Sequence, residues 1–166
     1  MKRLLKIVFL LLLPFGLTNC EKDDICDPSL STTPRLIIEF YSEQNPSVPR
    51  IVNNLSVKAP EIAESMIFTG VNKIELPLKT FENNTIYEFT INSTATDGSL
   101  NKDIVQFNYT TQDIYVSRAC GFKTYYDLNP TQGINIEPDT DNWIQNRTIV
   151  KTKIESENDV HIKLFY

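Results

Sequence analysis

The chain contains a single histidine, His161. General acid–base catalysis most often uses histidine, and a zinc site or a His–carboxylate pair needs further ligands beside it. His161 lies next to Lys163, opposite the apolar row of the last predicted strand. This placement favours a surface or edge position over a catalytic one.

Ser99 and Lys102 have the Ser-x-x-Lys spacing of acyl-transfer enzymes. In those enzymes the lysine lies one helical turn from the serine that it deprotonates. Here the tetrapeptide follows Asp97-Gly98, a turn signal, so we expect a hairpin loop and a chance match. We therefore predict no catalytic residues, no cofactor and no enzymatic activity.

Cys20 is the residue with the clearest chemistry, because it ends a segment that has the three parts of an export signal. Lys2, Arg3 and Lys6 are followed by an apolar run that is shorter than the roughly 20 residues of a transmembrane helix. The ending Leu17-Thr18-Asn19-Cys20 resembles a bacterial lipobox, although Asn19 departs from the usual small residue.

The lipobox resemblance implies cleavage after residue 19 and acylation of the Cys20 thiol with a diacylglycerol. Two or more acyl chains of the palmitate type anchor a protein stably, whereas one chain binds only marginally. The expected membrane partner is therefore lipid, held through Cys20. An ordinary secretory signal with a chance cysteine is the alternative.

Glu21, Lys22, Asp23 and Asp24 follow directly. A lysine with two acidic residues just behind the lipid-bearing cysteine resembles the lipoprotein export signal of Bacteroidota, which implies the outer face of the outer membrane. A solvated charged linker, with the protein on the periplasmic leaflet, remains the alternative.

The two other cysteines, Cys26 and Cys120, form an even pair if Cys20 carries lipid. An oxidising compartment then favours a disulfide between them. Such a bond would close a long loop and fix the end of the linker to the sheet. A catalytic or metal-binding cysteine is the alternative, which the single histidine and the lack of a C-x-x-C motif disfavour.

Two groups of residues could bind a ligand. Asp139 and Asp141 lie at alternate positions in an acidic loop, and such oxygen ligands can hold calcium. The loop lacks the glycine and the distant glutamate of the helix–loop–helix calcium motif, so a solvated loop is favoured. Trp143 and the tyrosines could stack on a glycan, although in a β-sandwich such rings more often fill the core.

Arg118 lies in an otherwise apolar row next to Cys120. A buried guanidinium must be paired, because an unpaired buried charge is very costly. We expect Arg118 to pair with Glu39 or Asp141, or to emerge at a bulge. The alternative is a contact with a ligand or a partner.

The whole chain is acidic, with a formal net charge of −5 over 166 residues. Residues 1–19 carry three basic residues and no acidic ones, so the remainder has a net charge of −8. An acidic surface repels phosphates, which argues against nucleic-acid binding. A hydrophobic content of 41% excludes a fully disordered chain, and a single long apolar run excludes a polytopic membrane protein.

Elements that position these residues are predicted by an alternation of apolar and polar side chains, which is typical of half-buried strands. Turn signals such as Asn45-Pro46 and Asn129-Pro130 separate the runs. The alternating runs are 35–41, 51–57, 73–78, 85–92, 103–110, 114–122, 148–154 and 160–166. One short helix is expected at 59–68, where Ile62, Met66 and Ile67 would share a face.

Short strands with frequent turns predict an all-β fold, an immunoglobulin-like antiparallel β-sandwich that follows a lipoprotein signal and a short tether. The expected domain organisation is a signal peptide at 1–19, an acylated cysteine and tether at 20–33, and one sandwich domain at 34–166.

The segments 20–26, 33–41, 76–78, 116–123, 141–144 and 161–165 together resemble an uncharacterised envelope lipoprotein family of Bacteroidota, a domain-of-unknown-function family. The resemblance implies a lipid-anchored envelope protein and assigns no catalytic residues. We therefore expect a non-enzymatic binding or scaffolding module of the outer membrane, with another outer-membrane protein as its candidate partner. A surface module for glycan or calcium is the alternative.

Overall fold

The computed structural model describes residues 25–30 and 32–166. Within this part of the chain every regular element is a β-strand. The strands are β1 Leu36–Tyr41, β2 Leu55–Lys58, β3 Met66–Phe68, β4 Lys73–Leu76, β5 Asn84–Ile91, β6 Asn101–Ser117, β7 Gly121–Leu128, β8 Ile134–Ile136, β9 Asn146–Ile149, β10 Lys153–Ile154 and β11 Ile162–Phe165. The predicted all-β class is confirmed.

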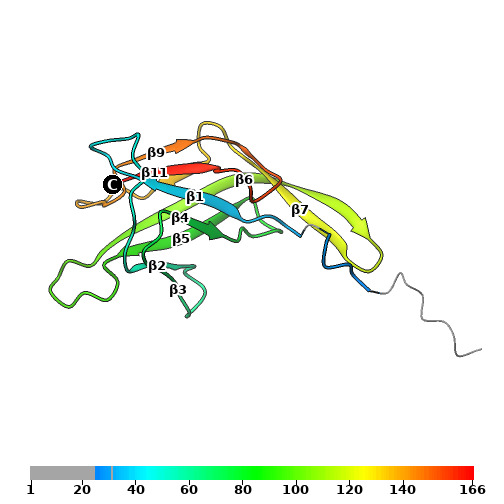
Figure 1. The fold of residues 1–166 in the computed structure, drawn as a ribbon, viewed down its shortest axis with the longest axis horizontal. Helices are drawn as coiled ribbons and strands as arrows, with labels where there is room; N and C mark the ends of the chain where they lie inside the picture. Colours follow the sequence, from blue (N-terminus) through cyan, green and yellow to red (C-terminus); the bar gives the residue numbers. More distant parts are fainter. Residues whose placement is uncertain (1–24, 31) are drawn as a thin grey trace, which may run out of the picture. The chain divides into compact units, whose positions relative to one another are not determined.

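The strands form two sheets (Figure 1). The smaller sheet has the order β4-β1-β11-β9, and the larger has the order β10-β7-β6-β5-β2-β3, with β8 added beside β6. Strands β1 and β11 pair in parallel, with Ile38 opposite Ile162. The long hairpin of β5 and β6 is antiparallel, with Tyr87 opposite Val105. The fold is a β-sandwich rich in antiparallel pairs.

The described chain divides into two compact units. The larger, which we call the sandwich unit, comprises residues 32–114 and 123–166. The smaller, which we call the disulfide unit, comprises the described residues 25–30 together with 115–122. The sandwich unit begins at residue 32, and the turn between β6 and β7 groups with residues 25–30.

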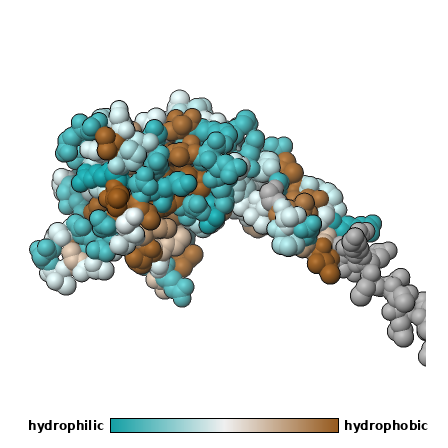
Figure 2. All heavy atoms as spheres, in the orientation of Figure 1, coloured by the Kyte–Doolittle hydropathy of each residue, from teal (hydrophilic) through white to brown (hydrophobic). Residues whose placement is uncertain are grey.

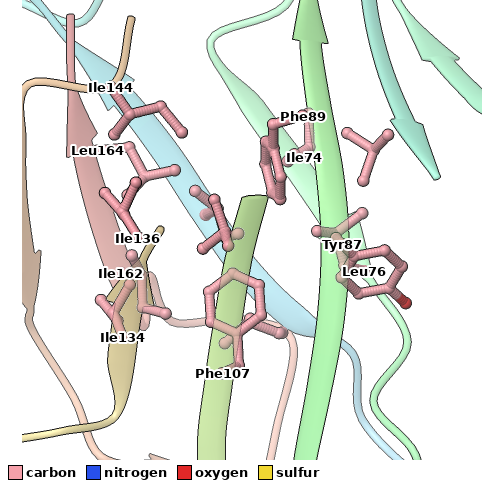
Figure 3. Close-up of a cluster of buried hydrophobic side chains, with 14 of the residues drawn as sticks. Ile74, Leu76, Tyr87, Phe89, Phe107, Ile134, Ile136, Ile144, Ile162 and Leu164 are labelled. Atoms are coloured by element: carbon pink, nitrogen blue, oxygen red, sulfur yellow. The ribbon is translucent and has the colours of Figure 1, made fainter. Parts of the chain in front are cut away.

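The core of the sandwich unit lies between the two sheets. Side chains at alternate positions of β1, β4 and β11 meet those of β5, β6 and β8. Figure 3 shows Ile162 and Leu164 on one side of this core, with Phe107, Tyr87 and Phe89 on the other. Alternation in the sequence therefore identified the buried face of these strands.

The predicted elements at 59–68 and 148–154 are wrong, and the predicted run 114–122 is broken by a turn at residues 118–120. The segment 59–68 contains no helix; its end forms β3, and Ile62 and Ile67 are 56% and 60% exposed. The run 148–154 is not one strand, because β9 ends at Ile149 and the exposed Val150 donates its backbone N–H to the carbonyl of His161. A shared face over one or two turns is too short to decide between helix and strand.

No helix in residues 25–30 and 32–166 is both long enough and apolar enough to cross a membrane.

Candidate functional site

The predicted anchor residues, Cys20 and Glu21 to Asp24, lie outside the described residues. The predicted disulfide is confirmed, since Cys26 and Cys120 are bonded with a Cα–Cα distance of 4.8 Å. The two residues are 94 positions apart in the sequence. Cys26 therefore fixes the segment that begins at the predicted tether to the turn between β6 and β7.

Arg118 does not occupy the buried, paired position that the apolar row predicted. Strand β6 ends at Ser117, and residues 118–120 form a turn in which Arg118 is exposed. Gly121 opens β7 with a φ of +70°, a conformation that side chains disfavour. The row was interrupted by this turn, and the Ser117 hydroxyl accepts a hydrogen bond from the backbone N–H of Cys120 at 3.0 Å.

Trp143 lies in the core with only 8% of its surface exposed, so it does not form an open sugar-binding face. Its ring stacks against that of Phe40, with the ring centroids 6.4 Å apart, and meets the ring of Tyr166 edge-on, with the centroids 5.3 Å apart. The indole N–H donates to the carbonyl of Phe89 at 3.0 Å. The tryptophan joins the two sheets instead of facing a ligand.

Sequence reasoning missed Asp103, a fully buried carboxylate that holds the loop before Trp143. Its Oδ2 accepts the backbone N–H of Ile144 at 2.8 Å, and its Oδ1 accepts that of Trp143 at 3.3 Å. The amide of Asn142 donates to Oδ1 at 3.2 Å. Burial raises the pKa of Asp103 in spite of these three donors. The sequence does hold a signal for this burial, because Asp103 lies two positions before Val105 and therefore on the same, buried face of the strand.

Asp139 and Asp141, the calcium candidates, are exposed, and the amide of Asn101 on β6 donates to the Asp141 carbonyl at 2.5 Å. Asp139 Oδ1 accepts the backbone N–H of Asp141 at 2.9 Å, and Asn142 Oδ1 accepts that of Asp139 at 3.0 Å. In residues 25–30 and 32–166, no group of three or more His, Cys, Asp or Glu side chains is arranged to hold a metal ion. Asp139 and Asp141 therefore shape a turn.

Three tyrosines hold a stretch of main chain instead of lining a surface. Their hydroxyls donate to three consecutive carbonyls: Tyr87 to Pro77, Tyr126 to Leu78 and Tyr109 to Lys79. Burial raises the pKa of Tyr87 and of Tyr126 to about 12. These phenols stay neutral at physiological pH and act as hydrogen-bond donors.

His161 is fully buried, so the prediction of a surface or edge position is wrong. Its Nδ1 accepts the backbone N–H of Ile37 at 3.0 Å, while its own backbone N–H donates to the Ile37 carbonyl at 3.0 Å. The ring thus takes the place of a main-chain carbonyl where β1 meets β11. Because Nδ1 is an acceptor, the proton of the neutral ring is on Nε2, which is also buried.

We expect the stability of the protein to fall as the pH drops below 6.5, the ordinary pKa of histidine. Burial, with a smaller contribution from Lys151, lowers the pKa of His161, against the opposing effect of Asp159. The unfolded chain therefore binds the extra proton first, so stability present above pH 6.5 is lost as the pH falls towards the lowered value. Protonation of Nδ1 would also remove the lone pair that accepts the backbone N–H of Ile37.

The control for this effect is His161→Asn, whose amide oxygen can replace Nδ1 as an acceptor and does not titrate. Urea unfolding from about pH 7.5 to about pH 5.5 should give a flatter stability profile for His161→Asn than for the wild type. Identical slopes would show that His161 does not contribute to this pH dependence.

Ser99 lies in the loop between β5 and β6, as predicted, and its backbone N–H donates to Asp97 Oδ1 at 3.0 Å. Lys102 lies on β6, with its Nζ 3.4 Å from Glu88 Oε2 on the adjacent strand β5. The lysine is therefore engaged with a carboxylate across the hairpin.

Two surface pockets of the sandwich unit share Pro130 and were not anticipated. One has a volume of about 530 Å³ beside Ile134 and Arg147, and the other of about 640 Å³ beside Asn108 and Asp127. Their polar groups are used internally: the Asn108 amide donates to the Gln132 carbonyl at 2.7 Å, and Lys153 pairs with Asp127 at 3.2 Å. In the first pocket, Nε of Arg147 likewise donates to the Ile134 carbonyl at 3.3 Å.

Comparison with curated proteins found no match, and comparison with solved structures found none either. A protein-family comparison matched residues 54–166, which include β2 to β11 and Cys120, to a family described as "Family of unknown function (DUF6452)". The match covers more than half of the chain, and the chain therefore belongs to this family of unknown function.

Proposed function

We propose that the protein is a lipid-anchored lipoprotein of the cell envelope of Bacteroidota, attached to the outer membrane through acylated Cys20. The disulfide between Cys26 and Cys120 carries this proposal. Disulfides persist in oxidising compartments outside the cytosol, which supports export of the chain. Disulfide formation also uses two of the three cysteines, so Cys20 is the one thiol left for lipid.

We propose further that the sandwich is a non-enzymatic binding or scaffolding module, with another outer-membrane protein as its partner. The residues with candidate chemistry support this role, because each is tied into the fold. His161 accepts a backbone N–H, Lys102 pairs with Glu88, and Ser99 lies in a hairpin loop. The sequence from Glu21 to Asp24 supports the outer face of the membrane as the destination, with the periplasmic leaflet as the alternative.

Replacing the acceptor thiol should release the protein from the membrane. We expect native protein to sediment with the envelope fraction and to enter the detergent phase of a Triton X-114 extraction. Cys20→Ser removes the only atom that can take the diacylglycerol, so the variant should lose this partitioning.

The matched control is Ser29→Ala, a small change at an exposed residue of the segment after Cys26. It should partition like the native protein. Membrane attachment that survives Cys20→Ser would show that the anchor is elsewhere and would refute the proposal.

A further inference from the structure

The disulfide unit presents apolar side chains on its surface. Ile25, Tyr115 and Phe122 are 80%, 58% and 67% exposed. Tyr115 and Phe122 meet edge-on with ring centroids 5.4 Å apart. Figure 2 shows hydrophobic atoms on the surface of this part of the chain. Exposed apolar groups that gather in this way mark a surface that contacts something other than water.

A positive charge accompanies these side chains. Arg118 is exposed in the turn, and within residues 25–30 and 32–166 its guanidinium forms no ion pair. Arg118, Tyr115 and Leu30 also line a pocket of about 380 Å³ within the unit. Aromatic rings beside a cation suit the boundary of a bilayer, where rings lie at the headgroup level and cations meet phosphates.

Chain length determines how far this surface can be from the proposed anchor. Six residue steps separate Cys20 from Cys26, so the two Cα atoms are at most about 21 Å apart. The disulfide places Cys120 only 4.8 Å from Cys26. The exposed rings of the disulfide unit flank Cys120 in the sequence. The short chain between Cys20 and Cys26 therefore keeps these rings close to the proposed acyl chains.

We propose that the disulfide unit docks into the interfacial layer of the phospholipid bilayer, with Tyr115 and Phe122 at the boundary of the acyl chains and Arg118 at the phosphates. This inference rests on the proposed acylation of Cys20. The short connection to the anchor selects the bilayer as the occupant over a second copy of the chain. The disulfide thus fixes the orientation of the hairpin turn towards the membrane.

Depth-dependent fluorescence quenching tests the docking. Acylated full-length protein carrying Phe122→Trp is reconstituted into phosphatidylcholine vesicles with or without bromine on the acyl chains. Brominated lipid should lower the fluorescence of the new indole about twofold, because an interfacial group lies about 5–10 Å into the bilayer. The matched control is Phe81→Trp, which changes a residue of the sandwich unit that is 96% exposed.

We expect Phe81→Trp to be quenched no more than the wild type, in which Trp143 is buried. Tyr115→Trp, on the strand opposite Phe122, serves as a second reporter if the first substitution disturbs the unit. Vesicle-bound protein with equal quenching of the Phe122→Trp and Phe81→Trp variants would refute the docking and leave the lipid anchor intact. Protein that does not float with the vesicles would instead refute the anchor.

Discussion

Replacing both Cys26 and Cys120 with serine should lower the free energy of unfolding by about 4 kcal/mol. The bond joins residues 94 positions apart, so it removes much of the conformational freedom of the unfolded chain. Urea unfolding followed by the fluorescence of Trp143 measures the change, because the indole is buried in the fold and exposed in the unfolded chain.

A reducing agent provides the control. It should destabilise the wild type by a similar amount and leave the Cys26→Ser/Cys120→Ser variant unchanged. A loss of less than about 1 kcal/mol in the free energy of unfolding would show that the bond constrains only the turn and does not stabilise the sandwich.

Asp103→Ala should cost about 3 kcal/mol of stability. The buried carboxylate accepts two backbone N–H groups and the amide of Asn142, and alanine leaves these donors without partners. The loop would then lose these three hydrogen bonds to β6, and the packing of Trp143 against Phe40 would loosen. Denaturant unfolding gives the loss in stability, and near-ultraviolet circular dichroism reports the environment of the indole.

Asp141→Ala is the matched control, because this aspartate lies in the same loop with an exposed side chain. It should cost less than about 1 kcal/mol. The stability of Asp103→Asn should fall between those of the two alanine variants. Its amide keeps one acceptor oxygen but places an NH₂ group against a backbone N–H that donates to the carboxylate in the wild type. Equal stabilities for Asp103→Ala and Asp141→Ala would contradict the role of Asp103.

The sequence predicted the fold correctly where a strand has one face exposed to solvent and one face buried. Val105, Phe107 and Tyr109 of β6 are buried in the core and alternate with partly exposed side chains of the outer face. The prediction was wrong at edges and breaks. Met66 and Ile67 belong to β3, which pairs only with β2 among the strands described, so few contacts impose a pattern there.

Prediction of the candidate site was limited by side chains whose role depends on distant main chain. His161 replaces a carbonyl for Ile37, 124 residues away, and no local pattern encodes such a pairing. Arg118 was misplaced because a period of two was extended through a turn. The disulfide was predictable because counting cysteines in a chain that is predicted to be exported needs no geometry.

Intact-mass analysis of the protein purified from the cells that produce it tests the central proposal most directly. We predict a chain that begins at Cys20, carries the added mass of a diacylglycerol and a further acyl chain, and is lighter by two hydrogens for the bond between Cys26 and Cys120. An unmodified Cys20 in the mature protein would contradict the account.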